Sequence, residues 1–190
     1  MSSQMVSHSG VRADLTRRLA VVVMGVSGSG KTTVGAALAY RWTTPFVDGD
    51  DLHPSANVEK MSRGNPLADE DRWPWLDLVG AVLRATASRG TVVVSCSALR
   101  RAYRDRLRLA THGAVRFVFL EASQAQIVER MAARSGHFMP AALIDTQFST
   151  LEAPTADESD VITVSADMPL EPLVETIIAA FADHATPGNV

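Results

Sequence analysis

Short apolar runs recur along the chain, and each is separated from the next by a stretch with helical character. The first run, 19–24 (LAVVVM), is continuously apolar and rich in valine, which is typical of a central strand buried on both faces. Further strands are predicted at 46–48, 91–95, 115–120 and 161–165. Strands that alternate with helices predict an α/β fold, with a parallel sheet covered by helices on both faces.

The segments between these runs predict helices and their ends. Pro54 suits the first turn of a short helix, Asp69–Asp71 suit the start of a longer one, and Gly90 suits its end. The predicted helices cover 31–42, 54–62, about 73–89, 99–110, 123–135, 140–152 and 170–182, with a break at 136–140. We expect one domain over 19–184, a flexible N-terminal tail over 1–18 and a C-terminal tail over 185–190.

The composition narrows the class of protein. The chain has 190 residues, 46% of them hydrophobic and 21% charged, which is the profile of one globular domain. Cys96 is the single cysteine, so no internal disulfide or thiolate zinc cluster forms, and the chain suits a reducing cytoplasm. A net charge of −3 argues against a nucleic-acid partner, and no apolar run is long enough to span a membrane. We therefore expect a cytoplasmic protein that binds small molecules.

A glycine-rich segment after the first strand carries the clearest chemistry. Residues 25–32 (GVSGSGKT) match G-x-x-x-x-G-K-[ST] and lie between a predicted strand and a predicted helix, as a phosphate-binding loop requires. Lys31 is expected to reach the β- and γ-phosphates during catalysis, and the Thr32 hydroxyl to hold Mg²⁺. No N-K-x-D motif follows, which favours ATP over GTP. The residues expected to bind the nucleotide are Gly25, Ser27, Gly28, Ser29, Gly30, Lys31, Thr32 and Thr33.

Carboxylates follow the second predicted strand, where a second substrate is expected to bind. Asp48 suits a magnesium site shared with Thr32, and Asp50 suits a hydroxyl that must be oriented and deprotonated. The alternative for these residues, and more so for Asp51, is a solvated acidic turn.

Polar and basic residues near the same place suit an anionic or polyhydroxy acceptor. His53, Asn57 and Lys60 have the spacing of one helix side, although an ordinary solvated face remains the alternative. Lys60 stands out because only 2 of the 18 basic residues are lysines. The further candidate cations for this site are Arg72, Arg101 and Arg104.

These residues form part of a longer set of motifs spread over 19–154. The set comprises DGDDLHP (48–54), Asn57, Lys60-Met61, Pro66-Leu67, Asp71-Arg72, SALRR (97–101), HFMP (137–140), Gln147-Phe148 and Leu151-Glu152. It closely resembles the gluconokinase family of the thermoresistant type. Three positions depart from the family pattern, namely Asp51, Thr146 and Ser165. The last of these puts only the contacts on the adenine side in doubt.

The resemblance implies a P-loop kinase fold similar to that of nucleoside-monophosphate kinases, with strand order 2-3-1-4-5 and a mobile lid at about 130–150. It implies ATP- and Mg²⁺-dependent phosphorylation of D-gluconate at its 6-hydroxyl, and it suggests a homodimer. The open alternatives are a kinase of another small hydroxy acid, such as shikimate, and a nucleotide-binding regulator without catalysis.

The resemblance also assigns roles in the predicted lid. Arg130 and Arg134 lie one helical turn apart. The resemblance implies that Arg130 contacts adenine and that Arg134 clamps the transferring phosphoryl group. His137 is expected to contact the acceptor. A charged helix face is the alternative for the two arginines, and Cys96 is expected to be a small buried residue of the core rather than a nucleophile.

Overall fold

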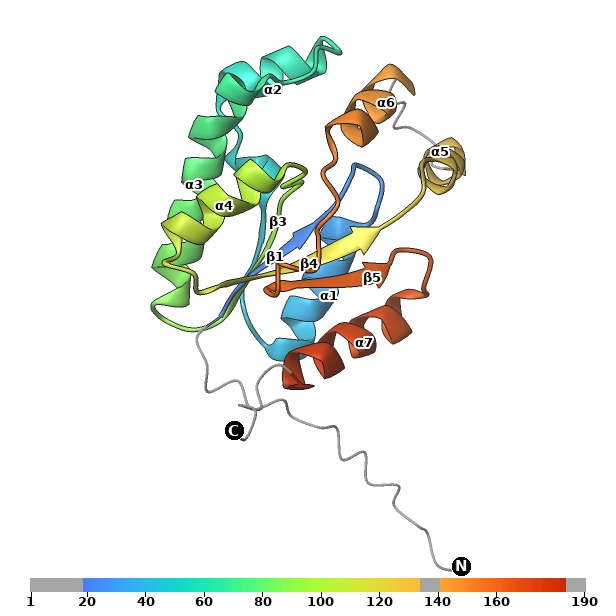
Figure 1. Cartoon of the computed structure of the whole chain (residues 1–190). Coiled ribbons are helices and arrows are strands. Elements are labelled where there is room, and N and C mark those ends of the chain that lie inside the picture. The colour runs from blue at the N-terminus through green and yellow to red at the C-terminus, as the bar shows by residue number, and fades with distance from the viewer. Residues whose placement is uncertain (1–18, 134–140, 184–190) are drawn as a thin grey trace, which may run out of the picture.

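The computed structural model describes residues 19–133 and 141–183, and within them five parallel strands form one sheet (Figure 1). The strand order is β2-β3-β1-β4-β5, as predicted, and β1 occupies the centre between β3 and β4. The strands are β1 Ala20–Met24, β2 Phe46–Asp48, β3 Val92–Ser95, β4 Val115–Glu121 and β5 Val161–Ser165.

Helices cover both faces of the sheet. In Figure 1, α1 and α7 lie on one face and α3 and α4 on the other, whereas α2, α5 and α6 lie beyond the carboxyl ends of the strands. The helices are α1 Lys31–Trp42, α2 Ser55–Ser62, α3 Asp69–Ala87, α4 Arg101–Ala110, α5 Gln124–Ala133, α6 Ala141–Thr150 and α7 Leu170–Asp183, with one turn of 3₁₀ helix, η1, at Gly49–Leu52.

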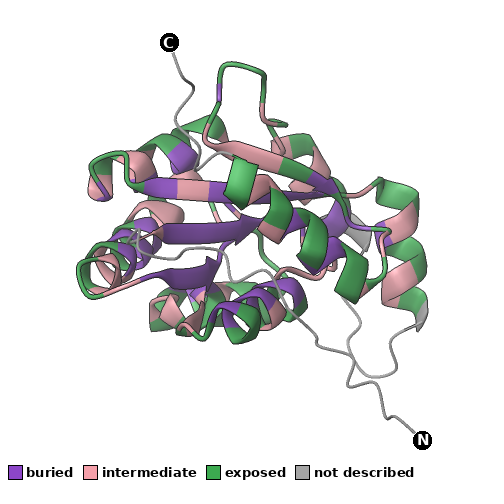
Figure 2. Cartoon of the chain, turned by 90° about the horizontal axis from the view of Figure 1, so that it is seen from below, coloured by how far each residue is buried: buried purple, intermediate pink, exposed green. Residues whose placement is uncertain are grey.

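Alternate side chains of the central strands supply the two halves of the core. Val22 of β1 packs with α3 and α4 on one face, and Val21 packs with α1 and α7 on the other, and both are fully buried. The central strands are accordingly purple in Figure 2, while much of the helix surface is green. A third and smaller cluster lies beyond the sheet and joins Val26, Leu99, Ile127 and Ile144.

The strand register brings three loops together at the carboxyl edge of the sheet. Asp48, the last residue of β2, pairs with Ser95, the last residue of β3, and β1 ends beside them at Met24. The next residue in the chain, Gly49, passes so close to β3 that a Cβ there would lie 2.1 Å from the Ser95 carbonyl oxygen. The two strand ends approach each other so closely that only glycine fits at this crossing.

The start of α3 differs most from the sequence prediction. Asp69–Asp71 were expected to cap a helix that begins near Trp73, but the helix already begins at Asp69 and contains Pro74. The Asp71 carboxylate accepts a hydrogen bond from the Ala68 backbone N–H at 2.7 Å, which stabilises the earlier start. Consequently Arg72 lies in the first turns of α3 rather than in the loop before it.

The predicted tails and the predicted break lie outside the described residues. Nothing in the structure therefore tests the boundaries at 1–18 and 185–190. None of the helices among residues 19–133 and 141–183 is both long and apolar enough to cross a membrane.

Arg104 is a structural residue, which corrects its expected role in substrate binding. Its side chain is 1% exposed, and it forms a two-fold ion pair with Glu158 at 2.6 and 2.7 Å. Its remaining nitrogen donates to the carbonyl oxygens of Ala98, Leu99 and Glu152. Arg104 therefore anchors the loop after β3 to the segment after α6, and each of its three guanidinium nitrogens already has a partner within the fold.

The Arg104–Glu158 pair generates a stability prediction. Burial opposes ionisation of Glu158, but the hydrogen bonds from Arg104 and Arg108 outweigh it and lower its pKa to about 2. Removing one partner of a buried pair costs about 3–5 kcal/mol, so Glu158→Gln should lose about that much unfolding free energy at pH 7. Because the folded pKa is depressed, this contribution is complete above the unfolded pKa of about 4.3 and is lost as the pH falls toward 2.

Urea unfolding of both proteins at several pH values between 2 and 7 measures this difference. The neighbouring Asp157→Asn is the matched control, because Asp157 pairs with Arg101 on the surface, where ion pairs contribute about 0–1 kcal/mol. Equal losses in the two variants at pH 7 would contradict the prediction.

Candidate active site

The phosphate-binding loop lies between the buried strand β1 and the N-terminus of α1. Gly28 and Gly30 have φ angles of 81° and 97°, a left-handed backbone conformation that favours glycine and forms the tight turns of the loop. Lys31 begins α1, and its Nζ donates to the Val26 carbonyl oxygen at 2.9 Å, across the loop. Burial lowers the pKa of Lys31, while the charges of Asp50 and Asp48 oppose that shift.

Thr32 and Asp48 form the candidate metal centre. Thr32 Oγ1 donates to Asp48 Oδ2 at 2.9 Å, and the other carboxylate oxygen accepts from Ser95 Oγ at 2.7 Å and from the Asp50 N–H at 3.1 Å. Burial raises the pKa of Asp48, but these three hydrogen bonds outweigh it and hold the pKa below its ordinary value. Asp48 is therefore a carboxylate at neutral pH.

This pair of hard oxygen donors fits Mg²⁺. No cluster of three or more metal-ligating side chains occurs among the described residues. Mg²⁺ is commonly bound by one or two protein oxygens together with water and substrate phosphates, and Thr32 and Asp48 meet that requirement.

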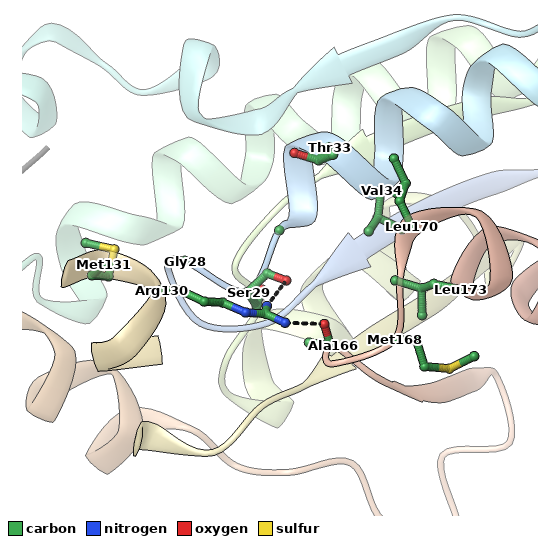
Figure 3. Close-up of a pocket in the computed structure, with 11 residues that line it drawn as sticks. Gly28, Ser29, Thr33, Val34, Arg130, Met131, Ala166, Met168, Leu170 and Leu173 are labelled. Carbon is green, nitrogen blue, oxygen red and sulfur yellow. Dashed lines mark hydrogen bonds between the residues drawn. The ribbon is translucent and has the colours of Figure 1, made fainter. Parts of the chain in front are cut away.

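A cavity of about 310 Å³ lies beside the loop, on the side facing α7 (Figure 3). Arg130 from α5 crosses it and donates to the carbonyl oxygens of Ser29, at 3.4 Å, and Ala166, at 2.5 Å. The other lining residues are Gly28, Gly30, Thr33, Val34, Met131, Met168, Leu170 and Leu173. An apolar cavity beside a phosphate loop, with an arginine across it, suits a flat heteroaromatic base.

A second cavity, of about 260 Å³, includes Lys31 in its wall and shares no lining residue with the first. It holds three charged side chains, Lys31, Asp50 and Arg72. The Asp50 carboxylate and the Arg72 guanidinium form no hydrogen bond or ion pair with any described residue. The other lining residues are Ser27, His53, Met61, Asn65, Pro66, Leu67, Ser97, Thr146, Gln147 and Thr150. This cavity can bind an anionic, hydroxyl-bearing molecule next to the phosphate loop.

His53 lines the second cavity as a neutral hydrogen-bond donor. Asn57 Nδ2 donates to the Asp71 carbonyl oxygen at 2.8 Å and lies 3.3 Å from His53 Nδ1, so that Nδ1 acts as the acceptor. The imidazole ring stacks on the Trp75 ring, with 4.2 Å between the ring centres. Burial lowers the pKa of His53; the charge of Arg72 lowers it further, whereas the charge of Asp50 opposes the shift. The proton of the neutral ring is therefore on Nε2.

Two predicted cations lie outside both cavities. Lys60 forms an ion pair with Asp71 at 2.5 Å, and Arg101 forms one with Asp157 at 2.7 Å. Asn57 is 4% exposed and holds α2 against α3, so that it is neither a ligand nor part of a solvated face. The burial of Arg104 excludes it from contact with a ligand in either cavity. Arg134 and His137 lie outside the described residues.

Comparison with known proteins agrees with this geometry. A family model described as an AAA domain matches residues 21–154. The chain is 47% identical to the gluconokinase of Gluconobacter oxydans over 162 residues, which are 85% of this chain and 90% of that protein. It is 44% identical to the thermoresistant gluconokinase of Escherichia coli K12 over 158 residues, covering 83% and 90% of the two chains. The chain belongs to the gluconokinase family.

The solved structures agree with the family assignment. The crystal structure of a gluconokinase from Sinorhizobium meliloti 1021 is 48% identical to this gluconokinase-family chain and has a TM-score of 0.81. The match covers 88% of this chain and 95% of that one. The predicted P-loop kinase fold and the predicted family are both confirmed.

Sequence reasoning missed two groups of lining residues in this family member. The loop after β5 supplies Ala166 and Met168 to the first cavity, although its residues carry no motif of their own. Gln147 and Ser97 were recognised only as members of family motifs, with no role, and both line the second cavity. The position of Gln147 within a motif was the signal that could have identified it.

The two lysines of the chain provide a paired test of this site. Lys31→Met should lower turnover about 10²- to 10³-fold and leave the fold intact, because it removes the positive charge that stabilises the phosphates in the transition state. Turnover and thermal unfolding of the unliganded variants measure the two effects. Lys60→Met is the control, since Lys60 pairs with Asp71 outside both cavities. A loss of turnover in Lys60→Met as large as that in Lys31→Met would contradict the positions assigned here.

Proposed function

We propose that the protein transfers the γ-phosphoryl group of ATP to the 6-hydroxyl of D-gluconate, giving 6-phospho-D-gluconate and ADP. The relatives named gluconokinase support this proposal. The single observation that carries it is the second cavity, where the Asp50 carboxylate and the Arg72 guanidinium, neither of them paired with any described residue, lie together with the phosphate-loop lysine.

On the donor side, the first cavity would take the adenine and the loop would take the phosphates. Arg130 would lie against the base, and the loop N–H groups with Lys31 would surround the β- and γ-phosphates. Thr32 and Asp48 would hold Mg²⁺, which supplies positive charge that neutralises the phosphates during transfer.

On the acceptor side, Asp50 would orient and deprotonate the attacking hydroxyl. Its carboxylate shares the cavity with Lys31 and has no hydrogen-bond partner among the described residues, so that it is available to accept from the 6-hydroxyl. The Nε2–H of His53 would donate to a neighbouring hydroxyl. Positioning of this kind is the main contribution that a protein makes to phosphoryl transfer.

Arg72 is the candidate for binding the carboxylate of gluconate, in place of Lys60. Its guanidinium lies 5.8 Å from the centre of the Tyr103 ring, and the Tyr103 hydroxyl donates to Asp69 at 2.7 Å. Asp69 is fixed in turn by Arg100, also at 2.7 Å. The aromatic ring thus orients the guanidinium without neutralising it, which leaves its charge for an anionic ligand.

An acceptor panel tests the proposed function. Purified protein with ATP and Mg²⁺ should phosphorylate D-gluconate, whereas shikimate, glycerate and the neutral polyol sorbitol should be poor acceptors. A coupled assay of ADP formation measures each, and chromatography of the product identifies the phosphorylated position. Faster turnover of shikimate or glycerate would replace gluconate as the substrate, and no transfer to any acceptor would favour the non-catalytic alternative.

Replacing Arg72 tests recognition of the acceptor's charge. A hydrogen bond to a charged group contributes about 1.5–3 kcal/mol, and about 1.4 kcal/mol corresponds to a tenfold change in affinity. Arg72→Met should therefore raise the gluconate KM about tenfold or more. The KM for ATP should stay close to that of wild type, because Arg72 does not line the nucleotide cavity. Arg101→Met, which removes a surface arginine from the same region, is the control. An unchanged gluconate KM in Arg72→Met would remove this residue from the acceptor site.

Replacing Asp50 separates activation of the hydroxyl from nucleotide binding. Asp50→Asn should lower turnover by about 10²–10⁴, the usual contribution of a general base, with little change in affinity for a non-hydrolysable ATP analogue. Steady-state kinetics and calorimetry provide the two measurements. Weakened analogue binding with normal turnover at saturating ATP would instead place Asp50 in the metal centre.

A further inference from the structure

One hydrogen bond joins α6 directly to the phosphate-binding loop. The Ser27 backbone N–H donates to Gln147 Oε1 at 2.6 Å, across 120 positions of the sequence. Both residues line the second cavity, which is called the acceptor cavity from here on. The contact therefore lies where the two proposed substrates would meet.

The packing around this hydrogen bond fixes the position of Gln147. Ile144, one turn earlier on α6, is 5% exposed and packs in the same small cluster as Val26, the loop residue before Ser27. Phe148, the residue after Gln147, packs against that cluster as well. Apolar contacts thus place α6 on the loop, and the amide group makes the polar contact between them.

The chemistry of the contact fixes the orientation of the amide. A backbone N–H can only donate, so the oxygen of Gln147 must face Ser27, and the NH₂ group occupies the other branch. That NH₂ group has no hydrogen-bond partner among residues 19–133 and 141–183. Two N–H donors are therefore available at the wall of a cavity that also contains Asp50 and Arg72.

We propose that Gln147 binds the acceptor: its oxygen is held by the phosphate loop, and its NH₂ group donates to a hydroxyl oxygen of the gluconate chain. This inference rests on the proposed function and adds a specificity-determining residue to it. Asp50, as a carboxylate, can only accept, and Arg72 is assigned to the carboxylate of the substrate. Gln147 and His53 then supply the neutral donors that the intervening hydroxyls require.

Two substitutions of similar size separate this role from a purely structural one. Gln147→Glu keeps an oxygen that can accept from Ser27 but has no NH₂ group, whereas Gln147→Met removes both. Both variants should raise the gluconate KM about tenfold or more, with the KM for ATP within about threefold of wild type. Ser149→Ala is the control, because Ser149 is exposed on the same helix, does not line the acceptor cavity, and its hydroxyl donates to the Thr146 carbonyl oxygen.

Steady-state kinetics with both substrates varied decides between the outcomes. A gluconate KM that is normal in Gln147→Glu and raised in Gln147→Met would show that only the contact with Ser27 matters, and would overturn the inference. An unchanged gluconate KM in both variants would overturn it too, as would an equal rise in the KM for ATP. The wild type in the same assay reports on the proposed function alone: if it fails to phosphorylate gluconate, the function fails and the assignment of Gln147 falls with it.

Discussion

The close approach of Gly49 to β3 is the constraint on which the rest of the site depends. Because no side chain fits between this residue and the Ser95 carbonyl oxygen, β2 turns sharply there into η1. The turn leaves Asp48 on the Thr32 side and places Asp50 in the acceptor cavity. The Gly49 carbonyl oxygen accepts from the buried indole nitrogen of Trp75 at 2.7 Å, and His53 stacks on the same indole. One tight crossing thus helps to set the positions of the metal centre, of the candidate base Asp50 and of His53 in the wall of the acceptor cavity.

The sequence predicted the parts of this site whose geometry is local. The spacing of Lys31 and Thr32 after a buried strand determines a phosphate loop, because the strand, the glycine turn and the helix N-terminus are consecutive in the chain. Asp48 and Asp50 could be placed for a similar reason, since parallel strands bring their carboxyl ends to one edge. The strand order was predicted through the family resemblance and is confirmed by the pairing of the strands.

Charge pairing over long distances could not be predicted in this way. Arg72, Arg101 and Arg104 look alike in the sequence, yet the first lines a cavity, the second has a surface partner and the third is buried. What separates them is the position of Asp157 and Glu158, more than 50 residues away, which only the folded chain reveals. Lys60 shows the same effect, because its partner Asp71 lies on another helix. The expected homodimer and the roles of Arg134 and His137 stay predictions.

The small apolar cluster beyond the sheet has a consequence for the order of events in a catalytic cycle. Ile127 of α5 and Ile144 of α6 belong to it, and the same two helices carry Arg130 of the nucleotide cavity and Gln147 of the acceptor cavity. A cluster of few side chains separates at a lower free-energy cost than the core on either face of the sheet. Parting of this one cluster would therefore loosen the walls of both cavities at once, while the loop, Asp48 and Asp50 stay fixed on the sheet. Exchange of spent nucleotide and of phosphorylated product would then share a single step, which couples their departure rates.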